Sequence, residues 1–280
     1  MPVALILSSF VAASRIGGGA QQYVLAAHRI DPVLAPTVLF GRSPAMGAAG
    51  DVTSPEVLRR MLADIEADAI FGEVDLVITG HFSLPEQVEI AAGLLERVRA
   101  AASRPPKVVV DPIMGDAPKG LYVKPQVADA VAARLTPLAD WITPNLWELE
   151  RLSGARVADA AEAVGACRKL GRAALVTSVP SGKGEIGLLY CDAETALLFS
   201  HHRLGHAPNG AGDLVTASFA AGLIEGMRPA AAAERAARVA AEAVQTAIAW
   251  GTPDLPIVAL AERLVSPTAE IRIETLQGLA

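Results

Sequence analysis

The chain has 280 residues, and 52% of them are apolar, so it can bury a large hydrophobic core. Lysine and arginine together number 24 against 30 acidic residues, which gives a formal net charge of −6. This mildly acidic balance, with the bases scattered, excludes nonspecific binding to nucleic acid or to an anionic membrane surface. The two cysteines, Cys167 and Cys191, are too few for a disulfide scaffold and are expected to be reduced thiols.

The N-terminal segment MPVALILSSFVAASRIGGG is apolar but has no basic start. Its apolar part is also too short to cross a bilayer, so it fits neither a secretion signal nor a membrane anchor. We interpret Val3–Leu7 as a buried first strand and expect a cytoplasmic protein.

Short apolar segments alternate along the chain with longer amphipathic ones. The short segments lack alternating polar residues, which is typical of a parallel sheet covered on both faces. They are Val3–Leu7, Thr37–Phe40, Leu76–Thr79, Val108–Val110, Trp141–Thr143 and Ala174–Thr177. The alternation predicts an α/β fold with a doubly wound, mostly parallel central sheet and helices on both faces.

The longer segments predict helices, and their start signals can be read directly. Ser54 is a favourable N-cap with Pro55 in the first turn, and helical spacing recurs in Leu84–Ala102 and Lys124–Leu135. Glu185–Leu204 departs from this rhythm and predicts an antiparallel hairpin at the sheet edge. Two Ala-rich helices follow, Leu214–Gly226 and Ala230–Trp250, and with no linker between segments we expect a single domain over residues 1–280.

Hydroxyl and carboxylate side chains follow the predicted inner strands. Ligands of open α/β sheets bind beyond the carboxyl ends of the strands, so these side chains predict a polar site there. They are Ser8 and Ser9, Asp111 and Asp116, Thr143, Asn145 and Glu148, and Thr177 and Ser178.

Asp111 and Glu148 each have two interpretations. Asp111 can cap a turn, and Glu148 can form a capping box with Asn145 three residues earlier. Alternatively the two carboxylates lie together and hold Mg²⁺, mainly through its waters, while the metal binds substrate phosphates. Thr177 and Ser178 could donate hydroxyl hydrogen bonds to a phosphate, or could simply stabilise a turn at a strand end.

The segment PNGAGD, Pro208–Asp213, precedes an apolar helical segment. Small residues at Gly210, Ala211 and Gly212 leave the N–H groups of a helix N-terminus open to an anion. A carboxylate at Asp213 could accept the proton of an alcohol beside that anion, as alcohol phosphorylation requires. Helix capping is the alternative role for Asp213.

The glycines of Ser14–Ala20 form neither a Walker A loop nor a dinucleotide-binding fingerprint. This counts against a nicotinamide-dependent oxidoreductase. His201, His202 and His206 lie near PNGAGD without metal-ligand spacing, and we interpret them as surface residues.

The motifs DPIMGD, TPNLWELE and GAGD, together with PTVLF and VTS, occur in this order over nearly the whole chain. This combination resembles the ribokinase-like superfamily and, within it, the pyridoxal (vitamin B6) kinases. The resemblance implies phosphorylation of the 5′-hydroxymethyl group of pyridoxal, pyridoxine or pyridoxamine, with ATP as phosphoryl donor, Mg²⁺ as cofactor and a homodimeric assembly.

The same resemblance implies roles for individual residues. Asp213 is implied as the catalytic base, with the amides of Gly210, Ala211, Gly212 and Asp213 as the anion hole. Asp111 and Glu148 are implied near Mg²⁺. The implied nucleotide contacts are Asp111, Asp116, Tyr122, Thr143, Glu148, Thr177 and Ser178. The implied substrate contacts are Ser9, Ser43, His81 and Asp213, although His81 could instead be a strand-end histidine bonded to the backbone.

The substrate side departs from the family's pattern. The first loop reads SSF, the lid segment FGRSPAMGAAG has no tyrosine, and Leu121 stands where one branch of the family has a reactive cysteine. A hydroxymethylpyrimidine-type kinase, another ribokinase-like kinase and a catalytically silent nucleotide-binding relative therefore remain as alternatives.

Overall fold

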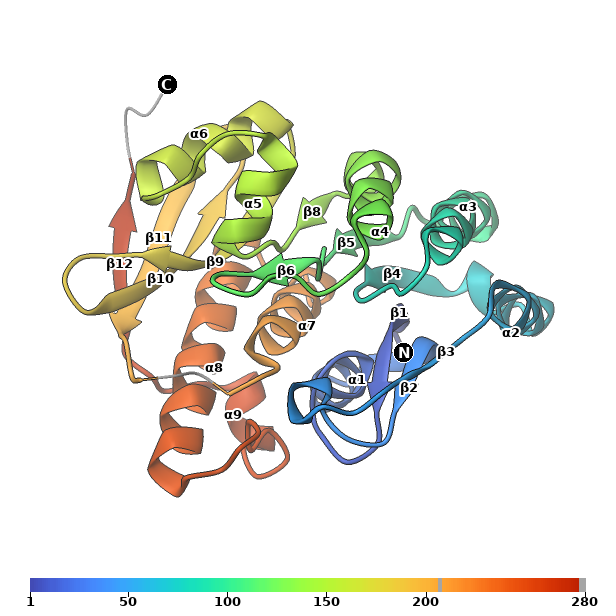
Figure 1. The fold of residues 1–280 in the computed structure, drawn as a ribbon, viewed down its shortest axis with the longest axis horizontal. Helices are drawn as coiled ribbons and strands as arrows, with labels where there is room; N and C mark the ends of the chain where they lie inside the picture. The colour runs from blue at the N-terminus through green and yellow to red at the C-terminus, as the bar shows by residue number, and fades with distance from the viewer. Residues whose placement is uncertain (206–207, 277–280) are drawn as a thin grey trace.

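The computed structural model describes residues 1–205 and 208–276. Within these residues, ten strands form one sheet in the order β12-β11-β10-β9-β8-β5-β4-β1-β2-β3 (Figure 1). The strands of this sheet are β1 (Val3–Val11), β2 (Asp31–Phe40), β3 (Asp51–Val52), β4 (Val74–Thr79), β5 (Lys107–Val110), β8 (Trp141–Ile142), β9 (Ala173–Pro180), β10 (Glu185–Cys191), β11 (Ala196–His202) and β12 (Arg272–Thr275). β6 (Gly115–Asp116) and β7 (Gly120–Leu121) form a separate small hairpin.

The central strands β2, β1, β4, β5, β8 and β9 are mutually parallel, whereas β3, β10, β11 and β12 pair antiparallel. Helices cover both faces, as the sequence predicts. They are α1 (Gly18–Ala27), α2 (Pro55–Ala67), α3 (Pro85–Ala101), α4 (Pro125–Ala130) with a π-helical turn over Val131–Leu135, α5 (Leu146–Ser153), α6 (Ala160–Leu170), α7 (Ala211–Ile224), α8 (Pro229–Trp250) and α9 (Ala261–Val265).

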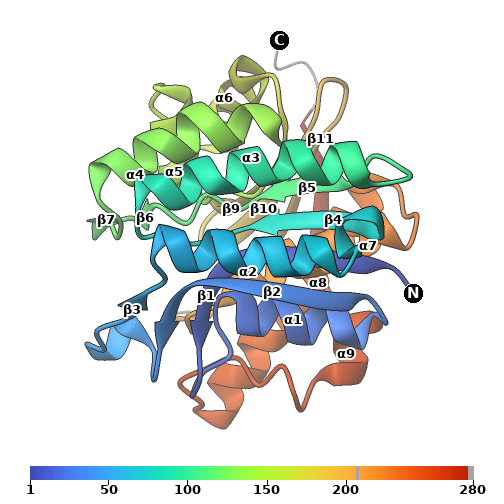
Figure 2. The same ribbon diagram turned by 90° about the vertical axis from the view of Figure 1, so that its right-hand side faces the viewer.

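Two hydrophobic cores lie on the two faces of the sheet. α2 to α6 pack over one face, and α1, α7, α8 and α9 pack over the other (Figure 2). Successive residues of β1 supply both cores, since Leu5 and Leu7 belong to the first and Ala4 and Ile6 to the second. This double burial explains why the strand sequences show no polar alternation.

The predicted hairpin exists, but its predicted position at the sheet edge is wrong. β10 and β11 pair antiparallel, and β12 then pairs with β11 and forms that edge of the described sheet. β12 is short, and its residues are all exposed. A strand with the sequence RIET carries no buried apolar pattern, so periodicity could not reveal it.

The direction in which successive strands are added to the sheet reverses at β1. β2 lies on one side of β1, while β4 lies on the other side and is followed outward by β5, β8 and β9. Such a reversal opens a crevice at the carboxyl ends of the two strands flanking it, here β1 and β4. Among the described residues, no helix combines the length and the apolar character needed to cross a bilayer.

Candidate active site

Asp213 lies in the first turn of α7, which points its N-terminus at the crevice beside β1. Its Oδ2 accepts a hydrogen bond of 2.8 Å from the backbone N–H of Gly17, at the start of α1. Its Oδ1 is enclosed and has no hydrogen-bond partner among the described residues. Burial raises the pKa of Asp213 to about 6, although the Gly17 hydrogen bond lowers it in part. The side chain thus bonds to another element and does not cap its own helix.

The N-terminus of α7 is shaped by Gly210, its N-cap residue. Gly210 has a φ of 93°, and a Cβ there would lie 2.9 Å from both the carbonyl oxygen of Arg15 and Cγ2 of Ile16. Only glycine fits this positive φ and close approach without strain. In the described structure no side chain caps the helix, and the first intrahelical bond runs from Leu214 N to Gly210 O. The amides of the first turn are therefore available to an anion.

Asp111, which follows β5, is buried and linked to α7 by a hydroxyl. Thr216 Oγ1 donates to Asp111 Oδ2 at 2.9 Å and is also hydrogen-bonded to Thr143 Oγ1 at 2.8 Å. Burial raises the pKa of Asp111 well above its usual range, and the nearby carboxylates of Asp213 and Glu148 raise it further. Asp111, Asp213 and Glu148 are thus brought together, as predicted for the first and third of these.

Thr216 is a site residue that the sequence reading missed. It lies three residues after Asp213, one turn further along α7, and is fully buried. Its signal was weak but present, because Thr216 is one of few polar residues in a mostly apolar helix and lies on the same side as Asp213.

Glu148 satisfies the capping interpretation and also approaches the site. Asn145 Oδ1 accepts from Glu148 N, and Glu148 Oε2 accepts from Asn145 N, both at 2.9 Å, which completes a capping box on α5. Glu148 Oε1 accepts from Met114 N at 2.7 Å and from Gly115 N at 3.3 Å. Burial raises the pKa of Glu148 to about 7, despite these hydrogen bonds. The same carboxylate therefore caps a helix and anchors the DPIMGD loop.

The chemistry of this acid cluster fits a cation. Among the described residues no group of three or more His, Cys, Asp or Glu side chains has the arrangement of a complete protein metal site. A magnesium ion needs only one or two protein carboxylates when waters and phosphates supply its other ligands. Burial raises the pKa of Asp111 and of Glu148, and a divalent cation beside them would favour their ionised forms.

Thr177 and Ser178 stand near the carboxyl end of β9, as expected. Thr177 N donates to Pro144 O at 2.9 Å, which joins β9 to the segment before α5. Ser178 is exposed and has a φ of 64°, a conformation uncommon for a residue other than glycine. Local strain of this kind often accompanies a binding site.

Asp116 and Tyr122 flank the small β6–β7 hairpin. Tyr122 N donates to Met114 O at 2.8 Å, and the Tyr122 ring is 49% exposed. Burial of its hydroxyl raises the pKa of Tyr122, and neighbouring Asp116 raises it further. Asp116 Oδ1 is enclosed without a hydrogen-bond partner in the described part of the chain.

Ser9 lies beside Gly17, which holds Asp213. A Cβ added to Gly17 would come within 2.3 Å of Ser9 Oγ, so the serine hydroxyl is next to the residue whose N–H holds Asp213. Ser43 is buried in the loop after β2, and its hydroxyl has no partner among the described residues.

His81 follows β4 in the crevice, but the backbone bond expected of its ring is absent from the described structure. Its Nε2 is hydrogen-bonded to the hydroxyl of Ser83 at 3.2 Å. The backbone of His81 bonds to side-chain hydroxyls. His81 N donates to Ser8 Oγ at 3.4 Å, and His81 O accepts from Thr37 Oγ1 at 2.5 Å. Burial lowers the pKa of His81 to about 4, so the ring is neutral at pH 7.

Of the three histidines near PNGAGD, His201 bonds through Nδ1 to His202 O at 2.9 Å, and His202 is exposed. His206 lies outside the described residues.

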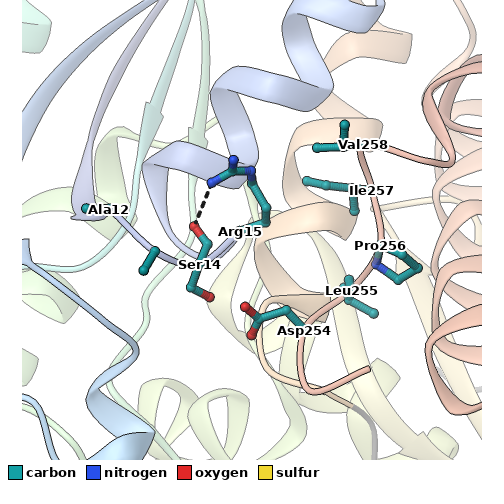
Figure 3. A pocket seen from close by; sticks show the side chains of 9 residues that line it. Ala12, Ser14, Arg15, Asp254, Leu255, Pro256, Ile257 and Val258 are labelled. Atoms are coloured by element: carbon teal, nitrogen blue, oxygen red, sulfur yellow. Dashed lines mark hydrogen bonds between the residues drawn. The ribbon is translucent and has the colours of Figure 1, made fainter. Parts of the chain in front are cut away.

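A pocket of about 330 Å³ opens on the outer side of this site, between residues 12–15 and residues 254–258 (Figure 3). It adjoins the α7 N-terminus, because Arg15 O lies against Gly210 and Asn209 pairs with Asp254. Its lining contains none of the candidate site residues, which lie instead around Asp213 on the crevice side.

Comparison with known proteins gives consistent relatives. The family model described as phosphomethylpyrimidine kinase matches residues 24–258. A pyridoxine/pyridoxal/pyridoxamine kinase of Bordetella avium is 31% identical over 246 residues, covering 85% of this chain and 83% of the relative. A pyridoxal kinase of Rubrobacter xylanophilus is 31% identical over 278 residues, covering 94% and 93%.

Solved structures match over nearly the full chain. A pyridoxal kinase from Leishmania donovani in complex with ADP and pyridoxamine aligns with a TM-score of 0.90 at 22% identity, covering 99% of this chain and 100% of that one. A putative phosphomethylpyrimidine kinase from Bacteroides thetaiotaomicron, crystallised with pyridoxal, aligns with a TM-score of 0.86 at 18% identity, covering 98% and 99%. At these identities the likeness establishes the fold.

Proposed function

This chain belongs to the pyridoxal kinase family, and from that premise we propose that it transfers the γ-phosphoryl group of ATP to the 5′-hydroxymethyl group of pyridoxal, pyridoxine or pyridoxamine. The observation that carries this proposal is the carboxylate of Asp213 in the first turn of a helix with open amides. Gly17 holds one of its oxygens, and the other has no hydrogen-bond partner in the described part of the chain. The relatives named as kinases of all three B6 vitamers support the choice of acceptor.

Asp213 is the proposed general base. With a pKa of about 6 it is mostly ionised at pH 7, and its free Oδ1 is available to the acceptor hydroxyl. As the hydroxyl oxygen bonds to the γ-phosphorus, the bond from that phosphorus to the β–γ bridging oxygen breaks and ADP leaves with the electron pair. The hydroxyl proton passes to Asp213. A base in this role contributes roughly 10²–10⁴-fold to the rate.

The amides of Gly210, Ala211, Gly212 and Asp213 are the proposed anion hole. Their N–H groups and the positive end of α7 stabilise the negative charge on the transferring phosphoryl oxygens. The close fit of Gly210 against Arg15 and Ile16 supports this role, because it holds the first turn in a fixed position.

ATP is proposed to lie along the carboxyl ends of β5, β8 and β9. Asp111 and Glu148 are the residues that would hold Mg²⁺, which when bound neutralises charge on the ATP phosphates. Thr143, Thr177 and Ser178 would donate to phosphate oxygens, and Asp116 and Tyr122 would border the nucleotide. The strained, exposed backbone at Ser178 supports a binding role for that strand end.

The acceptor is proposed to bind in the crevice at β1 and β4. Ser9, next to Gly17, and the neutral ring of His81 are positioned to hydrogen-bond a pyridine ring. Ser43 is proposed as a third contact from the loop after β2.

A second acceptor class is favoured by one specific observation. The family model that matches residues 24–258 carries the description phosphomethylpyrimidine kinase. A hydroxymethylpyrimidine presents the same primary alcohol on a heteroaromatic ring, so the proposed base and anion hole would serve it equally.

A turnover assay decides between these acceptors. The purified protein would be incubated with MgATP and, separately, pyridoxal, pyridoxine, pyridoxamine, hydroxymethylpyrimidine and ribose, with ADP release and phosphorylated product both measured. We expect the highest kcat/KM with a B6 vitamer. A preference for hydroxymethylpyrimidine would replace the proposed acceptor, and ATP binding without turnover on any alcohol would indicate a silent relative.

We further propose a homodimer that works in the cytoplasm. The exposed apolar side chains Phe10 and Leu39, which are paired across β1 and β2 next to the edge strand β3, support a subunit interface there. Free thiols at Cys167 and Cys191 are what a reducing compartment maintains. Light scattering coupled to size exclusion would test the assembly, and a monomer mass would contradict it.

A further inference from the structure

Two helices of the same layer meet at both of their ends. α1 and α7 pack against each other on one face of the sheet (Figure 1). At their N-terminal ends Gly17 N donates to Asp213 Oδ2 at 2.8 Å. At their C-terminal ends His28, the C-cap of α1, bonds through Nδ1 to Oε1 of Glu225, the C-cap of α7, at 2.7 Å. The helices therefore run parallel and are joined twice.

The distance between the two joints is nearly the same along α1 as along α7. Nearly the same number of residues separates Gly17 from His28 as separates Asp213 from Glu225, so each span is about 17 Å at about 1.5 Å per residue. A slide of α1 along α7 by the length of a hydrogen bond would break both joints together. The lower joint, between His28 and Glu225, thereby restrains the upper joint at the proposed base.

The lower joint links a fully buried ring to a partly exposed carboxylate. The His28 side chain is fully buried, and its Nε2 bonds to the carbonyl oxygen of Leu264 in α9 at 3.2 Å. A carboxylate only accepts hydrogen bonds, so Nδ1 is the donor in the contact with Glu225. Glu225 is also paired with Arg235 of α8. Burial raises the pKa of Glu225, but hydrogen bonds from Arg235 and His28 outweigh this and lower it, so it accepts as a carboxylate.

The turn after His28 holds the ring in place. Arg29 has a φ of 59°, and Ile30 N returns to bond to Leu25 O at 3.0 Å before β2 begins.

We propose that His28 is a positioning residue for phosphoryl transfer. By tying the C-terminal end of α1 to that of α7, it fixes where α1 lies along α7 and keeps the Gly17 N–H on the Asp213 carboxylate. The role in turnover rests on the proposed function, whereas the tie between the helices does not depend on it.

A matched pair of substitutions separates positioning from simple packing. The amide nitrogen of asparagine can occupy the place of the histidine Nδ1, and that of glutamine can occupy the place of Nε2. His28→Asn therefore retains a donor to Glu225 and loses the bond to Leu264, while His28→Gln retains the latter and loses the former.

Two measurements test whether His28 holds α1 in place along α7. Hydrogen exchange of the Gly17 amide, followed by NMR, reports on its bond to Asp213 without any turnover. Steady-state kinetics with MgATP and the best acceptor separate kcat from KM. For His28→Gln we expect the Gly17 amide to exchange about tenfold faster and kcat to fall about tenfold, with KM for ATP within about twofold, because a small misplacement of a base acts on the chemical step. For His28→Asn we expect the Gly17 exchange rate and kcat each to lie within about twofold of the wild-type value.

Further substitutions serve as controls, and the first separates the positioning effect from a general loss of stability. Val98→Ala removes buried volume from α3, on the opposite face of the sheet, and is expected to lower Tm without changing Gly17 exchange. Glu225→Ala should reproduce His28→Gln, and combining the two should add little, because both remove the same joint.

Equal effects of His28→Asn and His28→Gln, or unchanged Gly17 exchange in His28→Gln, would overturn the proposal. If the wild type phosphorylated none of the alcohols, the proposed function would fail, and Gly17 exchange would still decide whether His28 holds α1 on α7.

Discussion

Asp213 is bonded at one carboxylate oxygen and free at the other, and this asymmetry is what a general base needs. The bond from Gly17 orients the side chain, and the other oxygen is buried without a hydrogen-bond partner among the described residues. Capping and catalysis were the two interpretations of this acid from sequence. The structure removes the capping interpretation, because the side chain bonds to α1 and not to the amides of α7.

Replacing Asp213 by asparagine should remove the base while preserving shape. We expect Asp213→Asn to lower kcat by roughly 10²–10⁴-fold and to leave ADP affinity nearly unchanged, since the amides of α7 remain. Kinetics and calorimetric ADP titration would measure the two effects. Asp129→Asn, at an exposed carboxylate of α4, is the matched control and should retain full activity. Near-normal kcat in Asp213→Asn would disprove the base assignment.

The raised pKa of Asp213 predicts an acid limit to turnover. The base must be ionised, and its pKa of about 6 lies above the ordinary value, so protonation removes active enzyme as pH falls below about 6. We expect kcat to fall about tenfold per pH unit below that point and to level off above about pH 7. The residual kcat of Asp213→Asn should not show this fall at low pH. A kcat independent of pH between 5 and 7 would contradict the assignment.

At the scale of elements, α7 does three things at once. Its first turn presents amides and Asp213, its second turn carries Thr216 to Asp111, and its C-terminal end meets His28 of α1 through Glu225. Because α7 is buried on nearly all sides, between the sheet, α1 and α8, its position is set by packing. Displacement of this helix should affect the base and the acid cluster together.

Gly210→Ala should displace the start of α7. The new Cβ would meet Arg15 O and Ile16 Cγ2 at 2.9 Å, in addition to the strain of a φ of 93°. We expect a loss of stability of about 1–3 kcal/mol and a fall in kcat of at least tenfold. Denaturant unfolding and kinetics would measure these changes.

Gly171→Ala is the matched control for this prediction. Gly171 also has a positive φ, 62°, at the end of α6, but a Cβ there meets nothing within 4 Å. We expect a cost of about 1–2 kcal/mol from the backbone alone and unchanged kcat. Equal kinetic effects of the two substitutions would show that the fit of Gly210 against the Arg15 loop is unimportant.

At the scale of the whole molecule, the fold gathers negative charge at one end of the sheet. Asp111, Glu148 and Asp213 come from β5, α5 and α7, and burial raises the pKa of each. An acid with a raised pKa binds more protons folded than unfolded, so stability falls as pH rises from the unfolded pKa to the folded one. His81 acts in the opposite sense, because its pKa is lowered to about 4, but it is one group against three.

We therefore expect the ligand-free protein to lose thermal stability as pH rises from about 5 to 8. Asp111→Asn, which keeps an oxygen to accept from Thr216, should raise Tm at pH 8 by about 2–4 °C, or about 1 kcal/mol, while lowering activity. The gain should shrink toward pH 5, and MgADP should stabilise the wild type most at pH 8. Thermal melts followed by circular dichroism would test this. A Tm that rose steadily from pH 5 to 8 would contradict it.

Most of the sheet could be predicted from local pattern. Unbroken apolar runs such as Val108–Val110 revealed the inner strands, because a strand buried on both faces admits no polar position. Ser54 and Pro55 likewise marked the start of α2. β12 could not be found in this way, since its residues are exposed and its only structural signal is the partner β11.

The candidate site likewise contains some positions that local sequence predicts and others that it does not. The positions of Asp111 and Thr177 near strand ends were predictable, because chain order and the parallel sheet bring these strand ends to one edge. Thr216 was missed, and the ring of His81 bonds to Ser83 where a backbone partner was expected. Side-chain partners depend on the neighbouring elements, which local sequence does not specify.

By itself the sequence determined the fold class and the family, because buried strands and glycine-dependent turns leave local patterns that survive without knowledge of neighbours. The packing of the elements was needed to show that Asp213 bonds to Gly17, that Glu148 bonds to the Met114 amide of the DPIMGD loop, and that His28 meets Glu225. Each of these contacts joins residues from separate elements, and the energy that selects it, burial of charge against a specific partner, exists only once the elements have packed.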